Sequence, residues 1–186
     1  MGLQKQLLVL NDKPAIRYCL DAIIAAGVID IVVVLGQNGN KIREAINNLP
    51  VSIVLNTNPE SEMVESVKIG IQKIAGTATG ILVCLSDHPL VSLNTFRELI
   101  NSHGREPDKI LIPVFNGKNG HPGLFPKNIL NEIFSGINLR ELIRKNSDRT
   151  RLINVADEGV VLDMDTIADY RKILAKIRSG IVPVRP

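Results

Sequence analysis

The sequence of 186 residues has no tryptophan, two tyrosines, four phenylalanines and two cysteines. With so few aromatic side chains, the chain has little material for the stacking platforms that bind single-stranded nucleic acid. Its 22 basic residues exceed its 19 acidic residues by three, but they are spread along the chain and form no basic tract. The composition therefore argues against a nucleic-acid partner, and a small anionic ligand explains the slight basicity equally well.

Long hydrophobic runs are also missing. The longest apolar stretches, such as residues 31–36 and 81–85, are far below the roughly 20 residues that cross a bilayer. The first residues lack the apolar core of a secretory signal, and Cys19 and Cys84 stand apart without metal-ligand spacing. We therefore expect a cytoplasmic protein with reduced cysteines and no membrane association.

The pattern of apolar residues indicates the fold class. β-branched apolar runs alternate with stretches of helical period, which is typical of an α/β protein with a largely parallel sheet. The expected strands span residues 29–35, 51–55, 80–85, 110–114, 124–125 and 160–162, and the expected helices span residues 14–26, 41–49, 62–75, 94–103, 127–134, 139–144 and 166–175. We predict one domain over residues 1–180, followed by a flexible tail at residues 181–186.

Asp87 comes two residues after the end of the expected strand at residues 80–85. Ligands of open α/β sheets bind beyond the carboxyl ends of the strands. A carboxylate there suits Mg²⁺, which prefers one or two carboxylates together with phosphate oxygens and water. From position alone, an aspartate that caps a turn is an equally good interpretation.

Four further segments follow a recognisable order. Residues 5–8 read Lys-Gln-Leu-Leu, and residues 58–66 contain Asn-Pro followed by Met63 and Ser66. Residues 120–125 read Gly-His-Pro-Gly-Leu-Phe, and residues 163–166 read Asp-Met-Asp-Thr. Together with Asp87-His88-Pro89, this order resembles that of the MobA-like nucleotidyltransferases, and within them the molybdenum cofactor cytidylyltransferases.

The resemblance implies a fold and an activity. The fold is a Rossmann-like three-layer sandwich of the nucleotide-diphospho-sugar transferase type. The activity is the transfer of a cytidylyl group from CTP to molybdopterin with Mg²⁺, and a molybdenum hydroxylase is the expected recipient of the product. A GTP-dependent or sugar-phosphate nucleotidyltransferase, or a non-catalytic binding or scaffold protein, stays open as an alternative.

The resemblance also assigns roles to residues of this chain. Asp87 and Asp163 are the expected metal ligands, and Lys5, Asp87 and His121 are the expected catalytic residues. The expected substrate contacts are Lys5, Met63, Ser66, Gly120, His121, Pro122 and Asp165. Without the resemblance, Lys5 reads as a solvated lysine, His121 as a turn residue between glycines, and Asp163 and Asp165 as partners of the helix that follows.

The chain also departs from the family pattern. The family begins with a strand and the phosphate-binding loop Leu-Ala-Ala-Gly-x-Ser-x-Arg, which has no counterpart here. We therefore expect a free strand edge inside the fold, and either a longer native chain or a loss of ordinary nucleotide binding. Glu62 stands where the family has glycine, so its side chain and charge are expected to obstruct the nucleotide pocket. His88 replaces glutamine or methionine, and residues 136–140 keep little of the family motif for the molybdopterin side.

Overall fold

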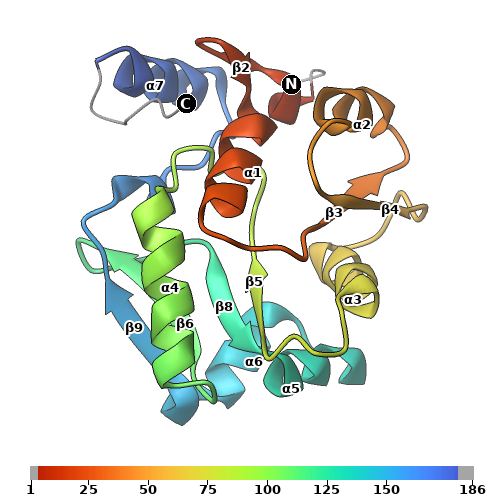
Figure 1. Cartoon of the computed structure of the whole chain (residues 1–186), viewed down its shortest axis with the longest axis vertical. Helices are drawn as coiled ribbons and strands as arrows, with labels where there is room; N and C mark the ends of the chain where they lie inside the picture. The colour runs from red at the N-terminus through yellow and green to blue at the C-terminus, as the bar shows by residue number, and fades with distance from the viewer. Residues whose placement is uncertain (1–3, 180–186) are drawn as a thin grey trace.

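The computed structural model of the chain describes residues 4–179, and the tail expected at residues 181–186 lies outside this range. The α/β class is confirmed (Figure 1). The larger sheet has the strand order β5 (Gly80–Val83), β8 (Gly123–Pro126), β6 (Ile110–Phe115) and β7 (Lys118–Asn119), with β9 (Thr150–Asn154) also paired to β6. This sheet is mixed, because β9 runs parallel to β6 whereas β8 runs antiparallel to both β5 and β6.

A second sheet stands apart from the first. It consists of β3 (Val32–Gly36) and β4 (Ser52–Asn56), which pair in parallel, while β1 (Val9–Leu10) and β2 (Lys13–Pro14) form a small hairpin. Within residues 4–179, β3 pairs only with β4, and β5 pairs only with β8. The expected free strand edge inside the fold is therefore confirmed, and there are two such edges.

The helices have the following bounds: α1 (Ala15–Ala25), α2 (Asn40–Ile46), α3 (Met63–Lys73), α4 (Leu93–Arg105), α5 (Lys127–Leu130), α6 (Leu139–Lys145) and α7 (Ile167–Arg178). Residues 4–179 also contain four 3₁₀ turns: η1 (Lys5–Leu7), η2 (Asn131–Ser135), η3 (Ser147–Arg149) and η4 (Glu158–Val161). In the part of the chain that is described, no helix combines the length and the apolar character that a membrane span requires.

Strand β6 separates two helical layers. Its side chains alternate between the two faces of the sheet. Leu111 packs with Leu99 of α4 on one face, and Ile110 and Ile112 pack with Ile71 of α3 and with the α5–α6 region on the other. All of these side chains are buried, and full burial of each stabilises the fold by about 1.5–3 kcal/mol. The result is a layer of helices on each face of the sheet, with α4 lying across β6 and β9 (Figure 1).

Four local predictions differ from the structure. The strand expected at residues 29–35 begins only at Val32, and Ile29 is 94% exposed. The helix expected from residue 94 begins at Leu93, because Ser92 caps it with a side chain that accepts a hydrogen bond from the Thr95 N–H. The strand expected at residues 160–162 is wrong, because residues 158–161 form the turn η4. The edge strand β9 was missed because only one of its five residues is buried, so its apolar signal is weak.

Turn η4 lies between residues 87–91 and residues 120–125. The Asp157 carboxylate accepts a hydrogen bond from Gly159 N–H at 2.9 Å and starts the turn. A Cβ atom on Gly159 would lie 2.2 Å from the carbonyl oxygen of Leu90, and one on Gly120 would lie 2.5 Å from that of Val160. Both glycines are therefore required for close backbone contact, and η4 brings residues 87–91 and residues 120–125 together.

This contact predicts the effect of an added methyl group. We expect Gly159→Ala to lower the free energy of unfolding by about 1–3 kcal/mol, because backbone must move to admit the Cβ atom. Gly104→Ala in α4 is the matched control, since no atom lies within 4 Å of the added Cβ, and we expect it to be neutral or to stabilise by up to about 1 kcal/mol. Urea unfolding measures the free energy of unfolding of both variants. Equal values would show that the contact between Gly159 and the Leu90 carbonyl is not close.

Candidate active site

Lys5 joins two carboxylates that are far apart in the sequence. Its Nζ donates to Asp87 Oδ2 at 2.8 Å and to Asp165 Oδ1 at 2.6 Å. Turn η1 supplies Lys5, the loop after β5 supplies Asp87, and the segment before α7 supplies Asp165. The structure thus brings together one predicted catalytic lysine, one predicted metal ligand and one predicted substrate contact.

His88 holds the other oxygen of Asp87. An ionised carboxylate only accepts hydrogen bonds, so His88 Nδ1–H donates to Asp87 Oδ1, at 2.9 Å. The hydrogen bond from His88, together with that from Lys5 and the Lys5 charge, outweighs burial and holds the pKa of Asp87 well below its usual range. Asp87 is therefore ionised, with both oxygens already engaged. The bond of His88 to Asp87 was not foreseen from the sequence.

The pKa of Lys5 responds to opposing influences. Burial lowers it, but the hydrogen bonds to Asp165 and Asp87 and the charges of both carboxylates raise it by more, so the net shift is upward. The ammonium group therefore keeps its charge at neutral pH. One positive and two negative charges meet at this point, which leaves a net negative site.

His121 approaches the same group from the glycine-rich segment. Its backbone N–H donates to the Val160 carbonyl at 2.8 Å, and its ring meets that of His88 edge to face with centroids 5.0 Å apart. Burial, with a smaller contribution from His88, lowers the pKa of His121, so its ring is neutral at physiological pH and one ring nitrogen accepts hydrogen bonds. Gly120 permits the contact with η4, and Pro122 follows a cis peptide bond.

The segment that carries Lys5 also touches the ends of two strands. Gln4 Nε2 donates to the Asn38 carbonyl, just beyond β3, at 2.5 Å. Gln6 Nε2 donates to Ser86 Oγ, just beyond β5, at 3.4 Å. The residues just beyond the carboxyl ends of β3 and β5 therefore contact the same short segment.

Two predicted substrate contacts lie on α3, outside the Lys5 cluster. Met63 begins the helix and is 52% exposed, whereas Ser66 Oγ accepts a hydrogen bond from Asn56 Nδ2 at 3.0 Å. Asn56 ends β4, is only 5% exposed, and also donates to Ser61 Oγ at 2.7 Å. It shapes the loop before α3 and was missed, although a polar residue at a strand end is the signal that singled out Asp87. Glu62 is exposed and has a φ of −70°, which any residue adopts.

The two acids before α7 differ in their contacts. Both are exposed, on either side of the buried Met164. Asp165 binds Lys5, whereas no hydrogen bond or ion pair within residues 4–179 involves Asp163. Thr166 caps α7 in a capping box with Asp169. The role of Asp163 as a metal ligand stays a prediction, and Asp165 is the acid that shares a cation with Asp87.

The residues at this point suit a divalent cation. Asp87 and Asp165 already hold one cationic group between them, the Lys5 ammonium. No group of three potential metal-ligating side chains is found among residues 4–179. Two carboxylates are what Mg²⁺ takes from a protein when phosphate oxygens and water complete its coordination. The donor set therefore fits a cation that arrives with a phosphate ligand.

Comparison with known proteins places the chain in a family. A family model described as the MobA-like NTP transferase domain matches residues 1–150. The chain belongs to this family. The description of the model supports a nucleotidyltransferase function, and the matched range includes Lys5, Asp87 and His121, whereas Asp163 and Asp165 lie beyond it.

Three proteins similar to this chain support the fold. Nicotine blue oxidoreductase of Paenarthrobacter nicotinovorans is 27% identical over 91% of this chain and 87% of its own length. The crystal structure of Rv0371c from Mycobacterium tuberculosis H37Rv superposes with a TM-score of 0.82 at 27% identity, covering 94% of this chain and 91% of that chain. The structure of Rv0371c in complex with manganese superposes with a TM-score of 0.76 at 24% identity, covering 94% of this chain and 93% of that chain. A CMP-2-keto-3-deoxy-manno-octonic acid synthetase in complex with CTP superposes with a TM-score of 0.78 at 14% identity, over 95% and 92%. These similarities confirm the nucleotide-diphospho-sugar transferase type of fold.

The Lys5 cluster predicts a response to mutation that can be read without a substrate. In Lys5→Met we expect the pKa of the Asp87 carboxyl to rise, because one of the two hydrogen bonds that favour its ionised form is gone. Titration followed by carboxyl carbon NMR measures this shift. Lys13→Met is the control, since Lys13 pairs with Asp21 and the variant is expected to leave Asp87 unchanged.

The same change alters the stability at acid pH. A lowered folded-state pKa means that ionised Asp87 stabilises the fold above its unfolded pKa, about 3.9, and that this stability is lost as the pH falls through the folded-state pKa. Lys5→Met is therefore expected to lose less stability on acidification than the unmodified chain. An identical acid-unfolding profile would show that Lys5 does not bind Asp87 in solution.

Proposed function

We propose that this family member transfers a cytidylyl group from CTP to the phosphate of a molybdopterin-type acceptor and releases pyrophosphate. The observation that carries the proposal is the meeting of Lys5, Asp87 and Asp165 beside the Gly-His-Pro-Gly-Leu-Phe segment, through His88 and His121. That segment favours a molybdopterin acceptor through its resemblance to the cytidylyltransferases. The CTP complex of a protein with the same fold is compatible with a cytidine nucleotide.

Each side chain of the cluster would have a separate role in such a transfer. The Lys5 ammonium lies where it offsets the negative charge of a triphosphate, which is how a positioned cation lowers the barrier to phosphoryl chemistry. His88 holds one oxygen of the Asp87 carboxylate, and in the proposed reaction neutral His121 would accept a hydrogen bond from the acceptor. The protein would act by positioning and by charge neutralisation, without a covalent intermediate on the enzyme.

Asp87 would hold a Mg²⁺ ion together with one of the two acids before α7. When bound, the ion supplies Lewis-acid neutralisation of the phosphate oxygens. The resemblance favours Asp163 as the second ligand, whereas the contact with Lys5 favours Asp165. Manganese in the complex of Rv0371c supports a divalent cation at a site of this fold.

Two variants separate these acids. If Asp165 holds the ion, Asp165→Asn is expected to weaken Mg²⁺-dependent CTP binding by about tenfold or more, and Asp163→Asn to leave it nearly unchanged, since loss of one ligand to a bound ion costs on the order of 1.4 kcal/mol or more. Isothermal titration calorimetry measures both. The reverse order would restore Asp163 as the ligand, and circular dichroism checks that each variant is folded.

The first experiment is calorimetric titration of the chain with CTP, GTP and ATP, each with and without Mg²⁺. A preference for CTP that requires Mg²⁺ is the expected result. Preference for GTP would indicate the GTP-dependent alternative. For the transfer itself, the measurement is pyrophosphate release with CTP and molybdopterin, which Asp87→Asn is expected to abolish while the far-UV circular dichroism spectrum stays the same.

A non-catalytic binding protein is the second candidate. The observation in its favour is that both oxygens of Asp87 are already engaged, by Lys5 and by His88. In such a protein the cluster would serve to tie the two ends of the chain to the loop after β5. Absence of Mg²⁺-dependent binding for every nucleotide, together with a large loss of stability in Lys5→Met, would favour this candidate.

A further inference from the structure

The Asp157 carboxylate joins turn η4 to the start of helix α4. Its Oδ1 accepts a hydrogen bond from the Gly159 N–H at 2.9 Å. Its Oδ2 accepts one from the Ser92 N–H at 2.8 Å and one from the Thr95 hydroxyl at 2.6 Å. Ser92 and Thr95 lie 65 and 62 residues away in the sequence. One half-buried carboxylate therefore ties two distant segments of the chain together.

Ser92 ends the loop that carries Asp87 and His88. The Ser92 side chain caps α4, whereas its backbone N–H is bonded to Asp157. The residues between His88 and Ser92 are buried, with Leu90 at 3% exposure. The bond to Asp157 therefore anchors the end of this loop at a buried position, directly after the residues of the candidate active site.

On its other side, η4 holds His121. The Val160 carbonyl accepts a hydrogen bond from the His121 N–H at 2.8 Å, and the Val160 side chain is fully buried. A Cβ atom on Gly120 would lie 2.5 Å from the same carbonyl oxygen, so the two backbones are in close contact. The position of His121 therefore depends on how η4 is placed, and Asp157 is bonded to η4 at Gly159.

The contact between His88 and His121 needs this support from the backbone. Their rings meet edge to face at 5.0 Å, and no hydrogen bond joins them among residues 4–179. An edge-to-face contact between two rings is a weak attraction. It therefore cannot by itself hold two loops in place, and the bonds of Asp157 supply a stronger link between the backbones that carry the two rings.

We propose that Asp157 is a positioning residue, whose carboxylate holds η4 against the start of α4 and thereby sets how His88 and His121 meet at the candidate active site. In the described part of the chain, Asp157 makes no hydrogen bond or ion pair with either histidine, so it acts through the backbone. Its consequence for catalysis rests on the proposed function: an acceptor bound to His121 is held less well when η4 moves.

Both oxygens of Asp157 are needed for this role. An asparagine side chain has one oxygen that accepts hydrogen bonds and an amide group that donates them. In Asp157→Asn, the oxygen can serve Gly159, or it can serve Ser92 and Thr95, but it cannot serve both sides. The substitution therefore keeps the shape of the side chain and breaks the link between η4 and α4.

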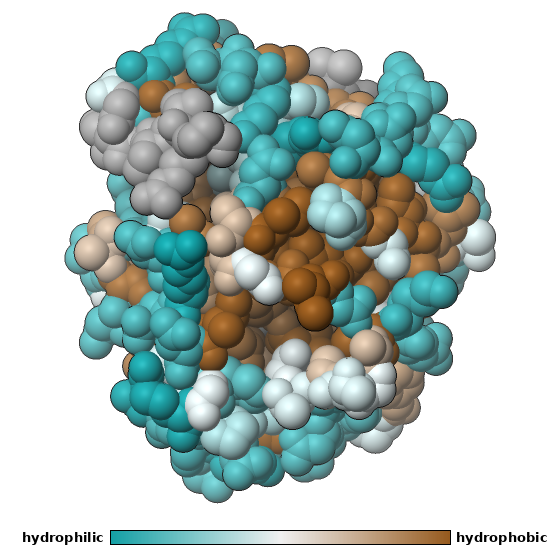
Figure 2. All heavy atoms as spheres, in the orientation of Figure 1, coloured by the Kyte–Doolittle hydropathy of each residue, from teal (hydrophilic) through white to brown (hydrophobic). Residues whose placement is uncertain are grey.

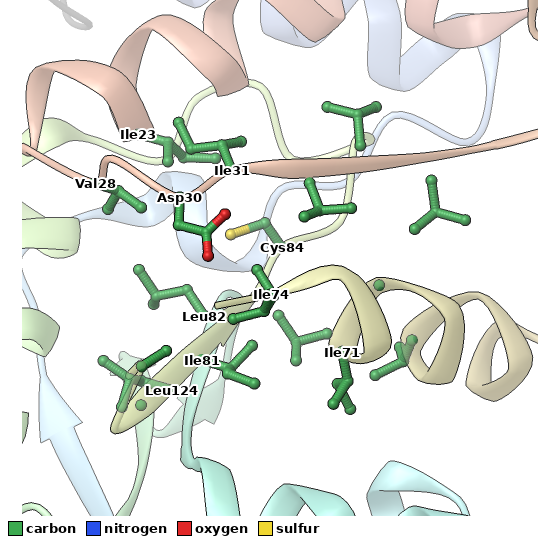
Figure 3. Close-up of a pocket in the computed structure, with 18 of the residues that line it drawn as sticks. Ile23, Val28, Asp30, Ile31, Ile71, Ile74, Ile81, Leu82, Cys84 and Leu124 are labelled. Atoms are coloured by element: carbon green, nitrogen blue, oxygen red, sulfur yellow. The ribbon is translucent and has the colours of Figure 1, made fainter. Parts of the chain in front are cut away.

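Asp30→Asn is the matched control. The Asp30 carboxylate also accepts a backbone hydrogen bond from a distant segment, from the Ala75 N–H at 2.7 Å. Asp30 lines an apolar slot of about 630 Å³, which Figure 2 shows as a hydrophobic hollow and Figure 3 shows in close-up. Asp87, His121 and Asp157 do not line this slot. The control therefore removes a comparable bond away from the candidate active site.

Two measurements test the proposal without a substrate. Hydrogen exchange follows the His121 N–H, and proton NMR follows cross-relaxation between the rings of His88 and His121. In Asp157→Asn, we expect exchange at His121 to speed up by about tenfold or more and the cross-relaxation between the rings to be lost. In Asp30→Asn, we expect both to stay unchanged, while exchange at Ala75 becomes faster.

A purely stabilising role for Asp157 gives a different result. In that case exchange in Asp157→Asn would speed up equally at His121 and at the buried amides of β6, such as that of Leu111, and the cross-relaxation between the rings would persist. That result would overturn the proposal. Unchanged exchange at His121 would overturn it as well.

Thr95 provides a milder pair of variants if Asp157→Asn does not fold. Thr95→Ser keeps the hydroxyl that binds Asp157, whereas Thr95→Val removes it with little change in volume. We expect exchange at His121 to be faster by about threefold or more in Thr95→Val, since one hydrogen bond is lost, and to be unchanged in Thr95→Ser. Equal rates in the two variants would overturn the proposal.

Kinetics separate this proposal from the proposed function. If the unmodified chain transfers a cytidylyl group, Asp157→Asn is expected to raise the KM for the acceptor by about tenfold and to leave the KM for CTP unchanged. An active variant with an unchanged KM for the acceptor would contradict the role of Asp157 in the reaction. No turnover by the unmodified chain would count against the proposed function, and the exchange and NMR results would still decide the positioning role.

Discussion

The close backbone contact at Gly159 is the constraint on which the candidate site depends. Turn η4 touches the Leu90 carbonyl on one side, and Val160 binds the His121 N–H on the other. The residues after β5 and those before β8 belong to adjacent strands of one sheet, but adjacency alone does not set how their loops meet. The turn fixes that distance, and the edge-to-face contact of His88 with His121 follows from it.

The second feature of the candidate site is the charged cluster of Lys5, Asp87 and Asp165. Asp87 receives one hydrogen bond on each oxygen, and Lys5 divides its ammonium between Asp87 and Asp165. The cluster links turn η1, the loop after β5 and the segment before α7, which come from the beginning, the middle and the end of the described chain. The cluster therefore ties three distant segments together as well as forming a candidate site. An isolated surface ion pair contributes little to stability, but here one ammonium group binds two carboxylates.

Much of the fold could be predicted from the sequence because most strands are apolar runs flanked by turn residues. The prediction failed where tertiary contacts decide the local structure. Val160-Val161-Leu162 has the composition of a strand, but Asp157 and the contact of Gly159 with Leu90 fold it into a turn. The site was partly predictable for the same reason: strand-end position singled out Asp87, whereas no sequence pattern shows that Lys5 reaches Asp165 across 160 residues. The partners of Asn56 and His88 are close to them in the sequence, but their hydrogen bonds were not predicted because they depend on how the loops after β4 and β5 fold.

The ammonium of Lys5 acts as a built-in counter-ion, and this has a consequence for ligand binding. A divalent cation that arrives alone must displace a positive charge that is already in place. A polyphosphate that arrives alone draws the ammonium toward itself and leaves two carboxylates facing each other. If both arrive together, as in the proposed reaction, the cation would pair with the carboxylates and the ammonium with the phosphate, so every charge would keep a partner. In the proposed reaction each ligand would thereby raise the affinity of the site for the other, to the same degree in both directions.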